Sequence, residues 1–157
     1  MVLDIKPGIG IGEIKFGLRR AQVVKVIGRA DEIEEDKYEE DGQLIKSEDW
    51  HYDEYEMSLS FDEDENWLLT TIAISSGQVT LAGVPMMGMG EAGLVDILRN
   101  MGIEDLEYED LSDRDNPNTL RVSSDEYGIS FWFEEGELTE IQCSPLLNEH
   151  GEIDWPE

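Results

Sequence analysis

"DEYEMSLSF" (Asp53–Phe61) and "DEYGISFWF" (Asp125–Phe133) lie 72 residues apart and share five of nine positions. In both segments apolar residues alternate with other residues, which is typical of a strand with one buried face. The alternation predicts these core-facing residues: Met57, Leu59, Phe61, Ile129, Phe131 and Phe133. The two segments therefore predict equivalent strands of a half-buried antiparallel sheet.

The similarity extends along the chain on both sides of these strands. The segments that precede and follow them form two further pairs: "FGLRRAQVVKVIG" (Phe16–Gly28) with "MGMGEAGLVDIL" (Met87–Leu98), and "LTTIAIS" (Leu69–Ser75) with "LTEIQCS" (Leu138–Ser144). The same order of features in both copies predicts an internal duplication. We expect one domain, residues 1–157, that contains two repeats, at about 10–76 and 77–146, and a C-terminal tail, 147–157.

Each repeat helps to interpret the other. Helical spacing of apolar residues before Gly102 predicts a helix at about 91–101, and the paired segment before Gly28 then predicts a helix at about 19–27. The core-facing residues of these helices would be Val23, Val24, Ile27, Leu94, Val95 and Leu98. Asp41-Gly42 between two strand-like segments predicts a tight hairpin turn.

These elements together predict the fold class. We expect an α+β protein built by internal duplication, in which each half is one short helix packed on about four antiparallel strands. One helix on four strands buries a small core, so the two halves are expected to share one core rather than to fold as separate domains.

Charge separates the chain into two regions. The 38 acidic and 11 basic residues give a net charge of −27, yet residues 1–29 hold six basic and only two acidic residues. A chain this acidic is a poor ligand for nucleic acid or for an anionic membrane, and we expect neither as a partner. The excess of acid favours a basic protein partner, or else a salt-rich or acidic setting.

The termini and apolar segments predict the compartment. "MVLDIKPG" at the N-terminus has no basic region followed by an apolar one, so no signal peptide is expected. No apolar run approaches 18 residues, and the single cysteine, Cys143, excludes an internal disulfide. These features predict a cytoplasmic protein.

Two segments carry a resemblance to known families: "KFGLRRAQVVKVIG" (Lys15–Gly28) and "LSFDEDENWLLTTI" (Leu59–Ile72). A helix entered in this way, followed by antiparallel strands and then repeated, resembles the tandem-repeat architecture of the β-lactamase inhibitor proteins and of related small outer-membrane lipoprotein modules. Those relatives are exported, so their compartment and target are not transferred to this chain. The layout and the acidity together are also similar to bacterial immunity proteins, which neutralise toxins in the cytoplasm.

Ligand-binding motifs are incomplete. "GMGEAG" (Gly88–Gly93) has the glycine spacing of a dinucleotide loop but lacks a predicted parallel β–α–β unit around it. "DEDEN" (Asp62–Asn66) has alternate oxygen ligands, but Trp67 and Ala73 stand where a calcium loop needs Gly and Glu. "DRDNPN" (113–118) has a proline at a ligand position. We expect no cofactor and no designed metal site, with weak calcium binding by these loops left open.

Catalytic sets are also absent from the sequence pattern. His51, His150 and Cys143 lack the spacing of zinc ligands, and Cys143 lies at a core position of a predicted strand. The 38 acidic residues produce every carboxylate spacing by chance, so no acid–base pair can be singled out. We therefore expect a protein that is not an enzyme.

Acidic and aromatic residues instead suggest a binding surface. Two acidic blocks lie at similar places in the repeats, 32–41 and 104–115, and aromatic residues stand among acids, as in protein-binding hot spots. The predicted partner-binding residues are Glu34, Glu35, Asp36, Glu39, Glu40, Trp50, Tyr52 and Trp132. The alternative is that Trp50 and Tyr52 belong to the core and that the tail covers Trp132.

The expected function is that of an acidic cytoplasmic inhibitor, most specifically an immunity protein that neutralises a basic toxin, such as a nuclease, by occluding its active site. Charge complementarity would accelerate association. Two alternatives remain open: a structural or regulatory module without a toxin partner, and a small-ligand-binding or enzyme domain with its pocket between the halves.

Overall fold

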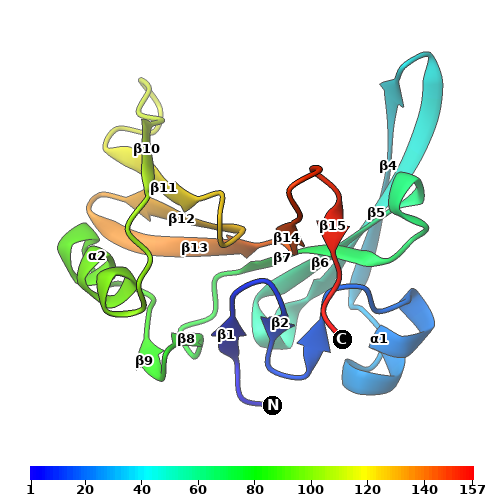
Figure 1. The fold of residues 1–157 in the computed structure, drawn as a ribbon, viewed down its shortest axis with the longest axis horizontal. Coiled ribbons are helices and arrows are strands. Elements are labelled where there is room, and N and C mark those ends of the chain that lie inside the picture. The colour runs from blue at the N-terminus through cyan, green and yellow to red at the C-terminus, as the bar shows by residue number, and fades with distance from the viewer.

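The computed structural model describes residues 1–157 and is dominated by one antiparallel sheet of eight strands (Figure 1). Its strands lie in the order β10-β11-β12-β13-β7-β6-β5-β4, so β13 and β7 pair at the centre. Their bounds are β4 (Glu32–Glu40), β5 (Gln43–Tyr52), β6 (Met57–Asp62), β7 (Leu69–Ile74), β10 (Glu107–Asp110), β11 (Thr119–Ser124), β12 (Ile129–Glu134) and β13 (Glu137–Cys143).

A smaller sheet and two helices cover one side of the large sheet (Figure 1). The small sheet consists of β1 (Asp4–Lys6), β2 (Gly10–Ile11), β3 (Ile14–Lys15), β8 (Thr80–Leu81) and β9 (Val84–Pro85), and β1 pairs with β8 in parallel. The helices are α1 (Arg20–Ile27) and α2 (Glu91–Asn100), and neither is long and apolar enough to cross a membrane. Short 3₁₀ turns follow β5 and β6: η1 (Asp53–Tyr55) and η2 (Glu63–Glu65).

The predicted fold class, an α+β duplication with each half one short helix packed on about four antiparallel strands, is wrong. Strands hold 46% of the residues and helices 15%, and the long strands form one continuous sheet. The helices have only eight and ten residues because Gly28 and Gly102 follow them with φ of 85° and 84°, which stops helical geometry. Glycine-rich segments that showed no strand pattern form the small sheet.

Several local predictions are confirmed. The expected helices correspond to α1 and α2. The turn at Asp41-Gly42 has positive φ at both residues, 50° and 78°, and joins the directly paired Glu40 and Gln43. This is the backbone geometry that favours Asp-Gly in a two-residue hairpin.

The core lies between the large sheet and the layer formed by the small sheet and the two helices. All six residues predicted to face the core from the two "DEY" strands are buried, including Phe61 and Phe133 at 0% and 1% exposure. Ile5, Ile11 and Leu81 of the small sheet belong to the same buried cluster. The opposite face of the large sheet is therefore not part of this core.

The C-terminal tail packs against the N-terminal segment rather than over Trp132. Its hairpin, β14 (Leu146–Leu147) and β15 (Ile153–Asp154), places Leu146 directly against Gly8. Trp155 lies against Gly17, where a Cβ would come within 3.0 Å of its ring. The Lys15 ammonium donates to the Glu157 carbonyl at 3.2 Å.

Candidate functional site

One row of directly paired residues crosses all eight strands on the side opposite the core, which we call the polar face. The row consists of Glu32, His51, Ser58, Ala73, Gln142, Ser130, Ser123 and Glu107. Its central members are small or uncharged, and a glutamate stands at each end. The middle of this face is therefore rich in small side chains with hydroxyl groups, while its borders are acidic. Leu147 and Ile153 of the C-terminal hairpin line a cavity together with Thr71, Ser130 and Gln142.

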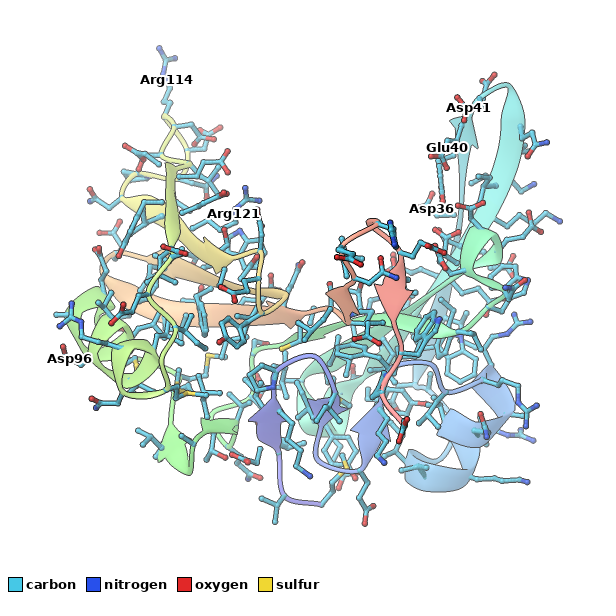
Figure 2. The ribbon with its side chains drawn as sticks, in the orientation of Figure 1. Asp36, Glu40, Asp41, Asp96, Arg114 and Arg121 are labelled. Carbon is cyan, nitrogen blue, oxygen red and sulfur yellow. The ribbon has the colours of Figure 1, made fainter.

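Two acidic hairpins border the polar face. The first hairpin, residues 32–52, is called the N-terminal arm and holds nine acidic residues and two lysines. The second hairpin, residues 104–126, is called the C-terminal arm and holds nine acidic residues and two arginines. Figure 2 shows Asp36, Glu40 and Asp41 along the first arm and Arg114 at the tip of the second. The arms rise on the side away from both helices (Figure 1).

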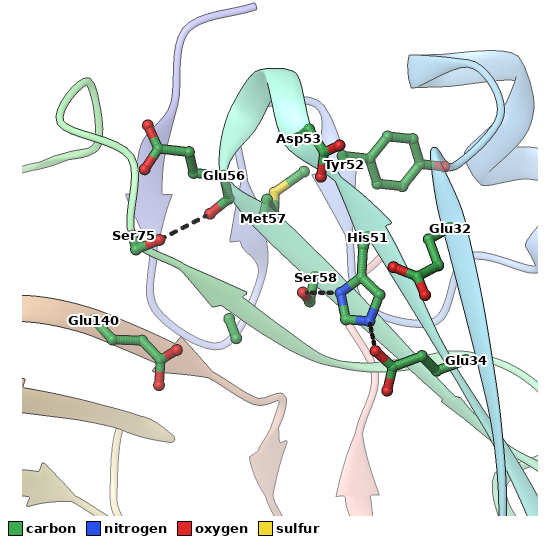
Figure 3. Close-up of a pocket in the computed structure, with 11 residues that line it drawn as sticks. Glu32, Glu34, His51, Tyr52, Asp53, Glu56, Met57, Ser58, Ser75 and Glu140 are labelled. Carbon is green, nitrogen blue, oxygen red and sulfur yellow. Dashed lines mark hydrogen bonds and ion pairs between the residues drawn. The ribbon is translucent and has the colours of Figure 1, made fainter.

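An acidic part of the polar face is an open cavity of about 360 Å³ beside the N-terminal arm (Figure 3). His51 lies at its centre and joins three strands: its Nδ1 is 2.6 Å from the Ser58 hydroxyl, and its Nε2 is 3.0 Å from Glu34 Oε1. The other carboxylates that line the cavity are Glu32, Asp53, Glu56 and Glu140. The cavity is thus suited to a cationic group.

The contacts Ser58–His51–Glu34 follow the order of a nucleophile, a general base and an orienting carboxylate. The surroundings of these residues are unfavourable for acyl transfer. Such chemistry needs hydrogen-bond donors aimed at a developing oxyanion. Ser58 lies on β6, which is paired with β5 and β7 on its two sides, and acidic side chains line the cavity around it. Negative charge would be destabilised there, so we assign the three residues a bracing role between strands.

Trp132 lies on the polar face at the C-terminal side, half-buried, as its strand parity predicted. The Arg121 guanidinium lies 5.9 Å from its ring centroid and forms an ion pair with Glu109 on the next strand. Figure 2 shows Arg121 on the side of the C-terminal arm that faces the N-terminal arm. Sequence reasoning missed Arg121, although it has the strand parity of the polar face.

Trp50 and Tyr52 are core residues, so they are not exposed anchors of a binding surface. Trp50 is directly paired with Leu59, which places it on the core side; its ring centroid lies 4.8 Å from that of Phe61. The Tyr52 hydroxyl donates to the Gly28 carbonyl at 2.9 Å, and burial raises the pKa of Tyr52 to about 12. This matches the alternative that the sequence left open for these two residues.

The five predicted acidic residues are all exposed on β4, but they do not share one face. Glu34, Asp36 and Glu40 have the parity of the polar face, whereas Glu35 and Glu39 have the opposite parity. A single flat partner therefore meets three of them at once.

Neither metal-binding nor thiol chemistry stands out in the structure. No group of three or more His, Cys, Asp and Glu side chains is arranged to hold a metal ion. In the "DEDEN" turn, the Asp62 carboxylate instead accepts from the Asp64 backbone N–H at 2.8 Å. Burial raises the pKa of the Cys143 thiol to about 12, which keeps it protonated and unreactive at neutral pH.

Comparisons with known proteins establish the fold alone. No protein-family model matches the chain, and no curated protein matches it in sequence. The chain is similar to the crystal structure of the uncharacterized protein yfeY from Escherichia coli, with a TM-score of 0.53 and 10% identity. That similarity covers 92% of this chain and 99% of the other, so it extends over nearly the whole architecture.

Proposed function

We propose that the protein binds a basic protein partner on the polar face, between the two acidic arms. The observation that carries this proposal is the charge of the arms: each holds nine acidic residues against two basic ones, and they border a face of small polar side chains. Dense like charge destabilises a folded chain by self-repulsion, and a basic partner relieves that repulsion.

The centre of the polar face supports close approach by another protein. Ser58, Ser60, Thr71, Ala73 and Ser130 project little from their strands. The hydroxyl groups of Thr71 and Ser130 are left for hydrogen bonds with a partner, whereas those of Ser58 and Ser60 already contact His51 and Asp49. Trp132 supplies the aromatic anchor that such interfaces commonly use. Its neighbour Arg121 would meet an acidic or carbonyl group of the partner, which adds specificity to an otherwise acidic surface.

The more specific form of the proposal is an immunity protein that occludes the cationic cleft of a toxin such as a nuclease. The acidic arms would occupy the positions of nucleic-acid phosphates in that cleft. Fast, salt-sensitive association follows from this arrangement, because steering by exposed charges is screened over about 8 Å at physiological ionic strength.

Association kinetics test the proposal. The protein is co-purified from its native cells, the partner is produced separately, and on- and off-rates are measured at several salt concentrations. Neutralising the five β4 acids to the corresponding amides (Glu34, Glu35, Asp36, Glu39 and Glu40) should slow association about ten-fold and leave the fold intact. A nuclease partner would also lose activity in the complex.

The matched control neutralises five exposed acidic residues outside both arms, Glu13, Glu54, Glu91, Asp96 and Glu157. It changes the net charge equally and should slow association much less. Equal effects of the two variants would show that only net charge matters, and the arm would lose its assigned role. Absence of a basic partner would favour the structural or regulatory alternative.

A further inference from the structure

The outermost strand of the large sheet, β4, has an unpaired edge along its whole length (Figure 1). It has nine residues, Glu32–Glu40, and every one of them is exposed. It contains no proline and pairs with β5 without a register shift. Proteins usually block such an edge with a bulge, a proline or charged side chains, because it can pair with another chain. Of these features, β4 has only the charged side chains, and six of its seven charges are negative, so they repel an acidic strand but attract a basic one.

Hairpin geometry shows which backbone groups of β4 face outward. In a two-residue hairpin the closing pair, here Glu40 and Gln43, exchanges both hydrogen bonds, and bonded pairs then alternate along the strands. The even-numbered residues of β4 therefore bond to β5. The outward-facing N–H and C=O groups belong to Ile33, Glu35, Lys37 and Glu39.

The side chains of β4 determine which strand can be added. Six of its nine residues are acidic and one, Lys37, is basic. Like charges directly opposite each other destabilise a strand pair, so a second copy of β4 is disfavoured as a partner. A strand rich in Lys or Arg would place a cation opposite an acid on both faces, while Ile33 and Tyr38, 48% and 39% exposed, cover its aliphatic stems.

The opposite edge of the sheet, formed by β10, is shorter. β10 is also acidic but has only four residues, Glu107–Asp110. A strand added there would gain about half as many backbone hydrogen bonds, because those bonds scale with the length of the paired edge. The two edges thus share a charge but differ in their capacity for a ninth strand.

We infer that the edge of β4 is a docking site for an extended basic segment of another protein, which adds to the large sheet as a ninth strand. The backbone edge of β4 is distinct from the polar face, although Glu34, Asp36 and Glu40 border both surfaces. Backbone hydrogen bonds supply the affinity, and the acidic side chains select a basic sequence.

The probe is a ten-residue peptide of alternating Lys and Thr, added to the isotope-labelled full-length protein. Binding is measured by calorimetry, and amide exchange is followed by NMR. At ten times the dissociation constant, exchange at Ile33, Glu35, Lys37 and Glu39 should slow by about ten-fold. Binding without added protection at these four amides would overturn the inference.

Two substitutions at one position separate strand addition from charge attraction. Lys37→Gln and Lys37→Pro both remove the same positive charge, and proline also removes an outward N–H without taking a bond from β5. Strand addition predicts that Lys37→Pro binds the peptide at least about ten-fold more weakly than Lys37→Gln. Equal binding by the two variants, with unchanged thermal unfolding, would show that charge alone holds the peptide and would overturn the inference.

Discussion

The two acidic arms differ in construction although they carry the same number of acidic and basic residues. The N-terminal arm has strands of nine and ten residues joined by two residues, and it projects as a regular hairpin. The C-terminal arm has strands of four and six residues joined by a longer loop, in which Asp113 accepts from the N–H groups of Asp115 and Asn116.

The arms also differ in what braces them. The N-terminal arm is held at its base by the His51 bridge between Glu34 and Ser58, and further out Tyr38 donates to the Asp62 carboxylate at 2.7 Å. In the C-terminal arm, Arg121 joins Glu109 to the Trp132 ring. Equal charge is thus presented on a long open edge in one arm and on a short, cross-braced loop in the other.

The largest expected effect concerns the core beneath the two arms. Phe61→Ala and Phe133→Ala should each lower the free energy of unfolding by about 3–5 kcal/mol, because both side chains are fully buried. Phe61 also packs against Trp50, so its loss should be the larger of the two. Denaturant unfolding measures both values. A loss below about 1 kcal/mol at both positions would contradict the assigned core face.

The next effect separates the roles of the arms in binding. Trp132→Ala should weaken partner binding by about 2 kcal/mol, mainly through faster dissociation, since a desolvated aromatic side chain acts on the bound state. Neutralising the β4 acids should act mainly on association. Surface plasmon resonance resolves the two rates. Dissociation unchanged by Trp132→Ala would remove this residue from the interface.

Substitutions at the turn residues of the two arm tips should have smaller and unequal effects on stability. Gly42 has φ of 78° and no atom within 4 Å of the place that a Cβ would occupy, so Gly42→Ala adds backbone strain without a clash. The expected loss of unfolding free energy is about 1 kcal/mol. Asn118 in the other arm has φ of 58°, a conformation that asparagine tolerates, and Asn118→Gly should change stability by only a few tenths of that. Thermal unfolding of both variants tests this, and equal effects would show that the two tips are equivalent.

The smallest effect is the coupling between Arg121 and Glu109. A double-mutant cycle with Arg121→Gln and Glu109→Gln should give about 0.5 kcal/mol, because exposed ion pairs contribute little. The coupling should fall in high salt. A coupling of zero at low salt would mean that the Arg121–Glu109 ion pair does not brace the C-terminal arm.

The sequence by itself determined the local elements of this protein. Alternation placed Leu59, Phe61, Phe131 and Phe133 on the core face, and glycines marked the helix ends, because side-chain periodicity and turn geometry depend on neighbouring residues only. The same logic predicted the Asp41-Gly42 turn, and strand parity placed Trp132 on the polar face.

Only the tertiary structure decided how those elements combine. The central pairing of β13 with β7 joins residues far apart in the chain and unites the long strands in one eight-stranded sheet, and no local pattern specifies that pairing. Burial of Trp50 and Tyr52 follows from pairing with β6, and the meeting of His51 with Glu34 and Ser58 requires the register of three strands. Parity along one strand is a local property, but the neighbours across a sheet are set by register, which long-range packing determines.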